Sequence, residues 1–233
     1  MKNNKLTPGK IFSYIVIFML APLTLYLTWK SGSKKYYLTS VLFMIYTMIP
    51  FFLSFEKRKP QARELVVLSV MTAIAVMSRA AFVMLPSFKP MSAVIIITAV
   101  SFGAEAGFMT GSMSALISNF VFGQGPWTPW QMFAYGMLGF FAGVLFSKNL
   151  IKRDKIPLSI FGGTAVILFV GPLLDICSVF TASSTITAQM FVPAFIAGLP
   201  MNLIHAAATV ITLYLFSGAM FEKLDRIKIK YGI

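Results

Sequence analysis

The chain has 233 residues, of which 58% are hydrophobic and only 12% are charged, and its formal net charge is +13. A soluble domain usually carries about 25% charged residues, so this composition excludes an ordinary water-exposed surface. Several apolar runs reach the roughly 18 residues that cross a bilayer core. Backbone amides must be paired internally in hydrocarbon, and the runs show no period-two alternation. We therefore expect an all-α integral membrane protein.

Eight apolar segments follow one another along the chain. They cover about 11–29, 37–54, 62–85, 91–105, 107–122, 129–147, 157–181 and 190–218. The first is too long for a signal peptide and lacks a clear Ala-x-Ala cleavage site, so we expect a retained helix. The charged stretch at 55–63 separates an N-terminal pair of hydrophobic helices, residues 1–56, from a six-span unit, residues 57–233.

The positive charges lie mainly between the apolar segments. With the N-terminus placed inside the cell, the alternating segments put 15 of the 20 Lys and Arg residues on the cytoplasmic side. The positive-inside rule then predicts a multi-pass membrane protein with both termini in the cytoplasm. Because the basic residues are not interleaved with aromatic ones, we expect no nucleic-acid partner.

Small residues recur every four positions in neighbouring segments. Gly107 and Gly111 do so in one segment, and Gly139 and Gly143 do so in the next. Lipid supplies no hydrophobic drive between helices, so such stripes promote association by letting two helices approach closely. We expect these glycines to pack inside the bundle.

Motifs for catalysis and for metal binding are absent from the sequence. There is no P-loop, so the chain does not hold ATP phosphates in that way. No His-Glu-x-x-His motif occurs, His205 is the single histidine, and only seven carboxylates are present. This leaves little material for a metal site or an acid–base pair, and we expect neither catalytic residues nor a metal site.

Polar and aromatic residues gather at the predicted outer ends of the last six spans. The outer segment Asn119–Met132 holds two Trp, two Gln and two Pro residues, which suit a flat, partly apolar ligand or, alternatively, an interfacial aromatic belt. Arg79 and Asp175 lie toward the same outer ends of their spans, and we expect them either to bind a ligand or to form an ion pair with each other. For Arg79, a further alternative is that its side chain extends to the outer lipid headgroups. For His205, helix packing is the alternative to ligand contact. The candidate substrate-binding residues are Arg79, Phe88, Asn119, Gln124, Trp127, Trp130, Gln131, Asp175, Asn202 and His205.

Three stretches of the six-span unit together resemble the substrate-binding S components of energy-coupling factor (ECF) vitamin transporters. Ala62–Phe82 resembles the first core helix of that family, Phe102–Gly111 the turn between core helices two and three, and Asn119–Met132 the outer loop between core helices three and four. The resemblance covers about 62–218 and is nearest to the cobalamin-specific S components of lactobacilli. It implies a six-helix bundle of the S-component type, preceded here by the N-terminal helix pair, in a bacterial cell membrane.

The resemblance also implies a function and a set of partners. An S component captures a vitamin from outside and delivers it inward with a membrane-embedded T component and two ABC ATPases, without enzymatic activity or an intrinsic cofactor. The expected ligand is cobalamin or a related corrinoid, with folate, riboflavin and a queuosine precursor as alternatives. The family's Ala-x-x-x-Ala face, which contacts the T component, corresponds here to Ser69 and Ala73. Outside transport, the alternatives are a membrane assembly protein and a membrane enzyme acting on lipid-borne substrates.

Overall fold

The computed structural model describes residue 23 and residues 36–147, 150–183 and 186–233. Apart from Leu23, the first predicted segment, 11–29, lies outside the described residues. The N-terminal pair of helices is therefore represented here by its second member.

The described ranges are helical and contain no strand. In chain order the elements are α3 (Tyr36–Lys57), α4 (Ala62–Ala81), α5 (Met91–Phe102), α6 (Ala104–Phe122), α7 (Thr128–Ser147), α8 (Lys155–Ala165), the π-helical turn η2 (Val166–Val170), α9 (Gly171–Ala182), the 3-10 turn η3 (Ala188–Met190) and α10 (Phe191–Tyr231). Within these ranges, five helical stretches are long and apolar enough to cross a membrane. The prediction of an all-α integral membrane protein is confirmed.

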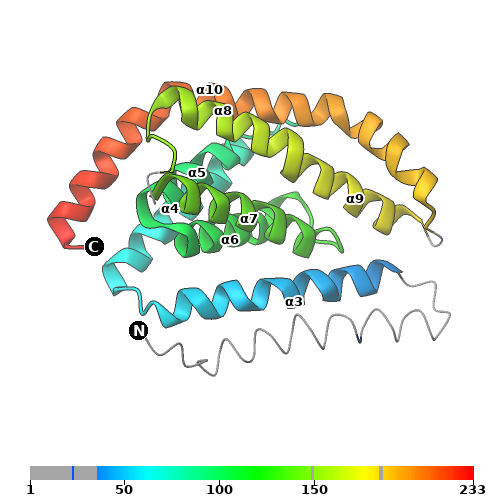
Figure 1. Cartoon of the computed structure of the whole chain (residues 1–233), viewed down its shortest axis with the longest axis horizontal. Coiled ribbons are helices and arrows are strands. Elements are labelled where there is room, and N and C mark those ends of the chain that lie inside the picture. The colour runs from blue at the N-terminus through cyan, green and yellow to red at the C-terminus, as the bar shows by residue number, and fades with distance from the viewer. Residues whose placement is uncertain (1–22, 24–35, 148–149, 184–185) are drawn as a thin grey trace.

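The helices of the six-span unit run alternately up and down. Figure 1 shows α10, α8 and α9 on one side of α6 and α7, and α3 on the opposite side. The helices α8, η2 and α9 continue one another as a single span. Pro172 near the start of α9 has no amide hydrogen, and the π-turn that precedes it accommodates the interrupted hydrogen-bond ladder.

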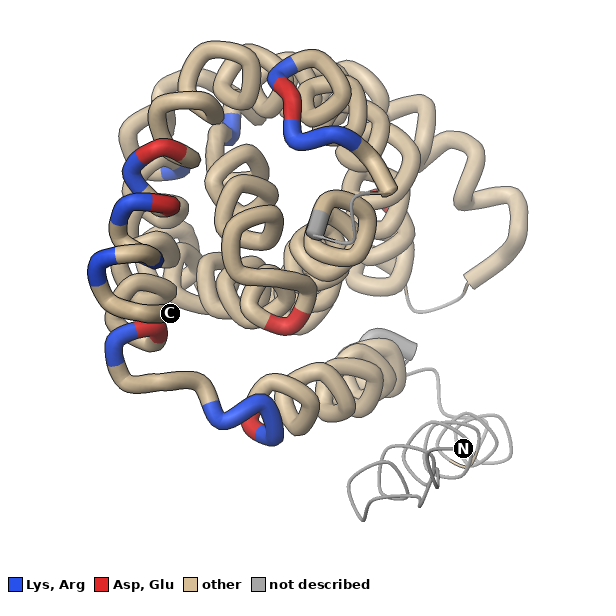
Figure 2. Tube along the Cα trace, turned by 60° about the vertical axis from the view of Figure 1, so that its left-hand side comes forward, with Lys and Arg blue, Asp and Glu red and all other residues tan. Residues whose placement is uncertain are grey.

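One end of the bundle carries most of the charge, and we call it the basic end. It comprises the α3–α4 connection, the start of α8 and the C-terminal turns of α10, and Figure 2 is turned so that it comes forward. Its cations are held by the bundle: Arg58 donates to the Phe102 carbonyl at 2.9 Å, and Lys228 donates to the Ser101 carbonyl at 2.7 Å. We call the opposite end, with the connecting segments 82–90 and 123–127, the far end.

Helix α10 extends well beyond its predicted end at residue 218 and continues to Tyr231. The apolar run stops where charged residues begin, but the helix does not stop there, because those charges are paired. Asp225 accepts a hydrogen bond from Arg153 at 3.1 Å, and Glu222 pairs with Arg226 one turn later.

Helix α5, which is shorter than those five stretches, lies at the centre of the bundle. All of its 12 residues are buried. At 1.5 Å per residue it covers roughly 18 Å, less than the roughly 30 Å of a hydrocarbon core. Because α5 ends at the basic end, beside Arg58, it begins well below the level that α4 reaches. The connecting segment is exposed from residue 82 to residue 86 and becomes buried only toward residue 90, where it meets α5.

The glycine stripes on α6 and α7 pack inside the bundle, as predicted, and they face each other. A Cβ atom at Gly107 would lie 2.6 Å from the carbonyl oxygen of Gly139, and one at Gly111 would overlap the carbonyl of Tyr135. Gly143 similarly abuts the backbone of Ala104. Backbone therefore contacts backbone along this interface, which places the far-end residues of both helices side by side.

Helix α3 packs against the outside of α6 and α7. Phe51 stacks on Phe108 with ring centroids 4.3 Å apart. Near its other end, the indole nitrogen of Trp130 donates a hydrogen bond to the Ser40 hydroxyl at 3.3 Å. Both ends of α3 are thus joined to the six-span unit.

Candidate functional site

Arg79, in the last turn of α4, points inward at the far end. One terminal nitrogen of its guanidinium donates to Ser118 Oγ at 2.6 Å and to Asn119 Oδ1 at 3.0 Å. The guanidinium carbon lies 4.4 Å from the centroid of the Phe122 ring. All three partners come from the last two turns of α6. Arg79 is therefore bound within the bundle rather than extended toward lipid headgroups.

Asn119 is the centre of this network and is almost fully buried. While its oxygen accepts from Arg79, its amide nitrogen donates to Thr128 Oγ1 at 3.0 Å and to Gln131 Oε1 at 2.8 Å. Thr128 in turn donates to Gln124 Oε1 at 2.8 Å. The structure thus connects four predicted residues, namely Arg79, Asn119, Gln124 and Gln131.

Thr128, which joins two of those residues, was missed by the sequence analysis. Its hydroxyl donates once and accepts from both Asn119 and the amide of Gly125. The available signal was a Thr before Pro129 at the start of an apolar run, a position where Thr commonly caps a helix.

A second set of buried polar residues is formed by His205, Ser92 and Tyr135. His205 on α10 is buried, and its Nε2 lies 2.7 Å from the Ser92 hydroxyl in the first turn of α5. The ring of the buried Tyr135 lies with its centroid 6.1 Å from that of His205. Tyr135 also lies within electrostatic range of Arg79. The sequence analysis missed Ser92 and Tyr135, which show no signal beyond a position near a predicted helix end or in an aromatic-rich span.

Lys89, in the segment that connects α4 to α5, is the other cation of the far end. Burial and the nearby charge of Arg79 lower the pKa of its ammonium group to about 8. No hydrogen bond or ion pair joins Lys89 to another residue in the described part of the chain. It was not among the predicted site residues, although it and Arg79 are the two cations of the six-span unit that the topology prediction leaves outside.

Asp175 and Asn202 lie together at another place, where α9 crosses α10. The Asn202 amide donates to Asp175 Oδ2 at 2.8 Å, and the two side chains fit against Gly198 and Gly171. The alternative of an ion pair with Arg79 is wrong, since no carboxylate described here lies within ion-pair distance of Arg79. The physical reason is that Arg79 faces α6 while Asp175 faces α10.

The three aromatic candidates have separate surroundings. Trp130 is buried against α3 and α9, with its ring centroid 5.6 Å from that of Phe180. Trp127 is 40% exposed, and Phe88 packs on Phe82 at 5.0 Å. Trp130 therefore has a packing role between helices, and its contact with a ligand stays a prediction.

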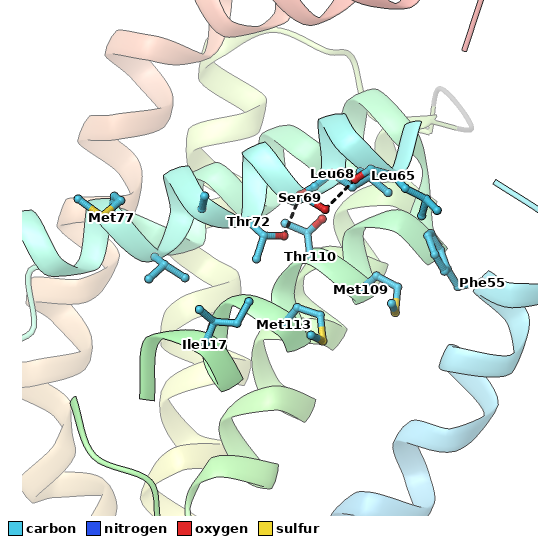
Figure 3. Close-up of a pocket in the computed structure, with 12 residues that line it drawn as sticks. Phe55, Leu65, Leu68, Ser69, Thr72, Met77, Met109, Thr110, Met113 and Ile117 are labelled. Carbon is cyan, nitrogen blue, oxygen red and sulfur yellow. Dashed lines mark hydrogen bonds between the residues drawn. The ribbon is translucent and has the colours of Figure 1, made fainter. Parts of the chain in front are cut away.

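A surface groove of about 340 Å³ runs between α4 and α6 and includes Ser69 and Ala73 (Figure 3). Met109 and Met113 of α6 lie opposite α4, and Phe55 of α3 lines one end. The Ser69 hydroxyl donates to the carbonyl of Leu65 in its own helix at 2.8 Å. Because this bond satisfies the hydroxyl, the serine presents an outer surface close to that of an alanine.

The sequence of this chain matches a known protein family. The family described as the S component of ECF-type riboflavin transporters matches residues 59–221. Among curated proteins, a UPF0397 protein of Vibrio atlanticus (strain LGP32) is 24% identical over 111 residues. That match covers 47% of this chain and 60% of the relative. No solved structure matches the chain.

Proposed function

The chain belongs to the family of ECF-type riboflavin transporter S components, and on that premise we propose that it captures a vitamin at the far end and delivers it across the membrane. The observation that carries this proposal is that the family match, residues 59–221, encloses the whole hydrogen-bonded far-end network. Ligand sites are concave and carry a few placed polar groups within apolar walls. The far end provides such groups on α4, α5, α6, α7 and α10.

The proposed orientation places the far end outside the cell and both termini in the cytoplasm of a bacterial cell. The support is the distribution of charge: among the described basic residues of the six-span unit, those other than Arg79 and Lys89 belong to the basic end. A ligand that binds at the far end then comes from the external supply of vitamin.

The first ligand candidate is cobalamin or a related corrinoid. A corrin ring is flat, its rim is rich in amides and its nucleotide loop carries a phosphodiester, so Asn119, Gln124 and Gln131 offer suitable partners. Riboflavin is the second candidate, because the matching family is described as a riboflavin transporter component. Folate and a queuosine precursor are the remaining ligand candidates.

The partners in this proposal are a membrane-embedded T component and two ABC ATPases. The groove between α4 and α6 is the proposed T-component contact, because Ser69 and Ala73 on it present small side chains that allow close helix approach. This role differs from ligand capture, and Ser69 and Ala73 precede Arg79 by about two to three turns of α4.

Uptake of radiolabelled vitamin in a transport-deficient bacterial host tests the function. The full chain would be expressed with and without T component and ATPases, and cobalamin, riboflavin and folate would be supplied separately. We expect uptake of one vitamin, and only when the coupling subunits are present. Absence of uptake for every vitamin, with all subunits detected in the membrane, would contradict the proposal.

A further inference from the structure

The two cations of the far end have no acidic partner. All seven Asp and Glu residues lie within the described ranges, and six of them belong to the basic end: Glu56, Glu64, Glu105, Asp154, Glu222 and Asp225. The seventh, Asp175, is hydrogen-bonded to Asn202 at the crossing of α9 and α10. The ion pairs found among the described residues include neither Arg79 nor Lys89.

Arg79 is nevertheless held in a defined position. Ser118 and Asn119 accept from one terminal nitrogen, and the ring of Phe122 supports the guanidinium face. The other terminal nitrogen and Nε make no hydrogen bond within the described part of the chain. A guanidinium fork oriented by neutral partners, with donors left over, is the arrangement that binds oxyanions in pairs of parallel hydrogen bonds.

Lys89 increases the local positive charge. It lies close enough to Arg79 for the two charges to repel, and both act on the buried His205. The other titratable neighbour is Tyr135, which is not acidic. Holding two like charges together in a partly buried site costs free energy, and no Asp or Glu of the described chain forms an ion pair there to offset it. An anion supplied from outside the protein would offset it.

We propose that Arg79 and Lys89 together bind an oxyanion of the transported molecule, either a carboxylate or a phosphodiester. This inference rests on the proposed function and narrows its substrate class to acidic micronutrients. It favours a corrinoid with its nucleotide loop over one without it, and it disfavours riboflavin, which is neutral.

The test uses matched ligand pairs that differ by the anionic part: cyanocobalamin and dicyanocobinamide, folate and 6-hydroxymethylpterin, and riboflavin 5′-phosphate and riboflavin. Binding to the full chain in nanodiscs would be measured by equilibrium dialysis. For the pair that binds, we expect the anionic member to bind roughly 10- to 100-fold more tightly, the range of a charge-assisted hydrogen bond. Lys89→Gln should remove most of that preference, and Lys89→Arg should restore it.

Lys152→Gln is the control, since Lys152 is exposed at the basic end and the substitution changes the net charge equally. Equal binding of both members of a pair, or equal weakening of both by Lys89→Gln, would overturn this inference while the vitamin-binding function stands. Binding of none of the six compounds would overturn both. Nanodiscs with and without phosphatidylglycerol separate the two sources of oxyanion: loss of the preference only with phosphatidylglycerol would assign the site to a lipid headgroup.

Discussion

The two ends of the bundle contain cations in opposite settings. At the basic end, Arg58 pairs with Glu64 and Arg153 pairs with Asp225, and Lys228 is bound by a backbone carbonyl. At the far end, Arg79 is oriented by neutral side chains, and Lys89 has no hydrogen-bond partner among the described residues. This difference shows that a cation with a carboxylate or carbonyl partner in its own chain contributes to stability and topology. A cation that is held in place but has no carboxylate partner is available to a ligand. Four predictions test this contrast, from the largest expected effect to the smallest.

Arg79→Gln should weaken binding of the anionic ligand roughly 100-fold, because it removes a charge-assisted contact and leaves the buried Asn119 oxygen without its donor. Affinity in nanodiscs measures this effect. Arg226→Gln is the matched control, since Arg226 forms an exposed pair at the basic end and surface pairs contribute little. A loss of affinity in both variants would remove the contrast between the two ends.

Ala73→Trp should lower vitamin uptake about 10-fold or more, because an indole would fill the groove between α4 and α6 and block the close approach of the T component. Vitamin binding by the isolated chain should stay unchanged, because Ala73 lies nearly two turns of α4 away from Arg79. Ile160→Trp on the exposed surface of α8 adds similar bulk elsewhere. Normal uptake in Ala73→Trp would contradict the proposed docking face.

Arg58→Gln should lower the free energy of unfolding by about 1–3 kcal/mol and leave ligand affinity within about 2-fold. The substitution removes the ion pair with Glu64 and the bond to the Phe102 carbonyl, both far from the ligand site. Thermal unfolding in detergent, with and without ligand, separates the two effects. An affinity change larger than the stability change would show that the basic end also contributes to binding.

Affinity for the anionic ligand should fall as pH rises through about 8, by at most about 10-fold per pH unit. The pKa of Lys89 is lowered to about 8, so its ammonium attracts an anion below that pH and loses its charge above it. Arg79, Tyr135 and His205 also face this region, and Lys89→Gln distinguishes their contribution. The variant should show a flat profile from pH 7 to 9, and a persistent slope would assign the titration to another group.

Part of the site was predictable from sequence because polar residues are costly at membrane depth and therefore conspicuous. Arg79 was identified in this way, and Asn119, Gln124 and Gln131 were identified by their place in an outer segment with two Trp and two Pro residues. The structure joins the four by hydrogen bonds. Ser92 was not identified, because a serine in an apolar helix commonly bonds to its own backbone. Its actual partner, His205, lies 113 positions away in the chain.

The sequence by itself determined the helical membrane architecture, because the pairing of backbone groups in hydrocarbon depends on local composition and segment length. It also indicated that the glycines of α6 and α7 pack inside the bundle, since glycines four residues apart form a flat surface whatever the partner; that these two surfaces meet each other was decided by the tertiary structure. The tertiary structure alone decided that Trp130 turns toward Ser40 of α3, 90 positions away, and that α10 continues to Tyr231. These outcomes depend on contacts between distant segments, which exist only once the helices have packed.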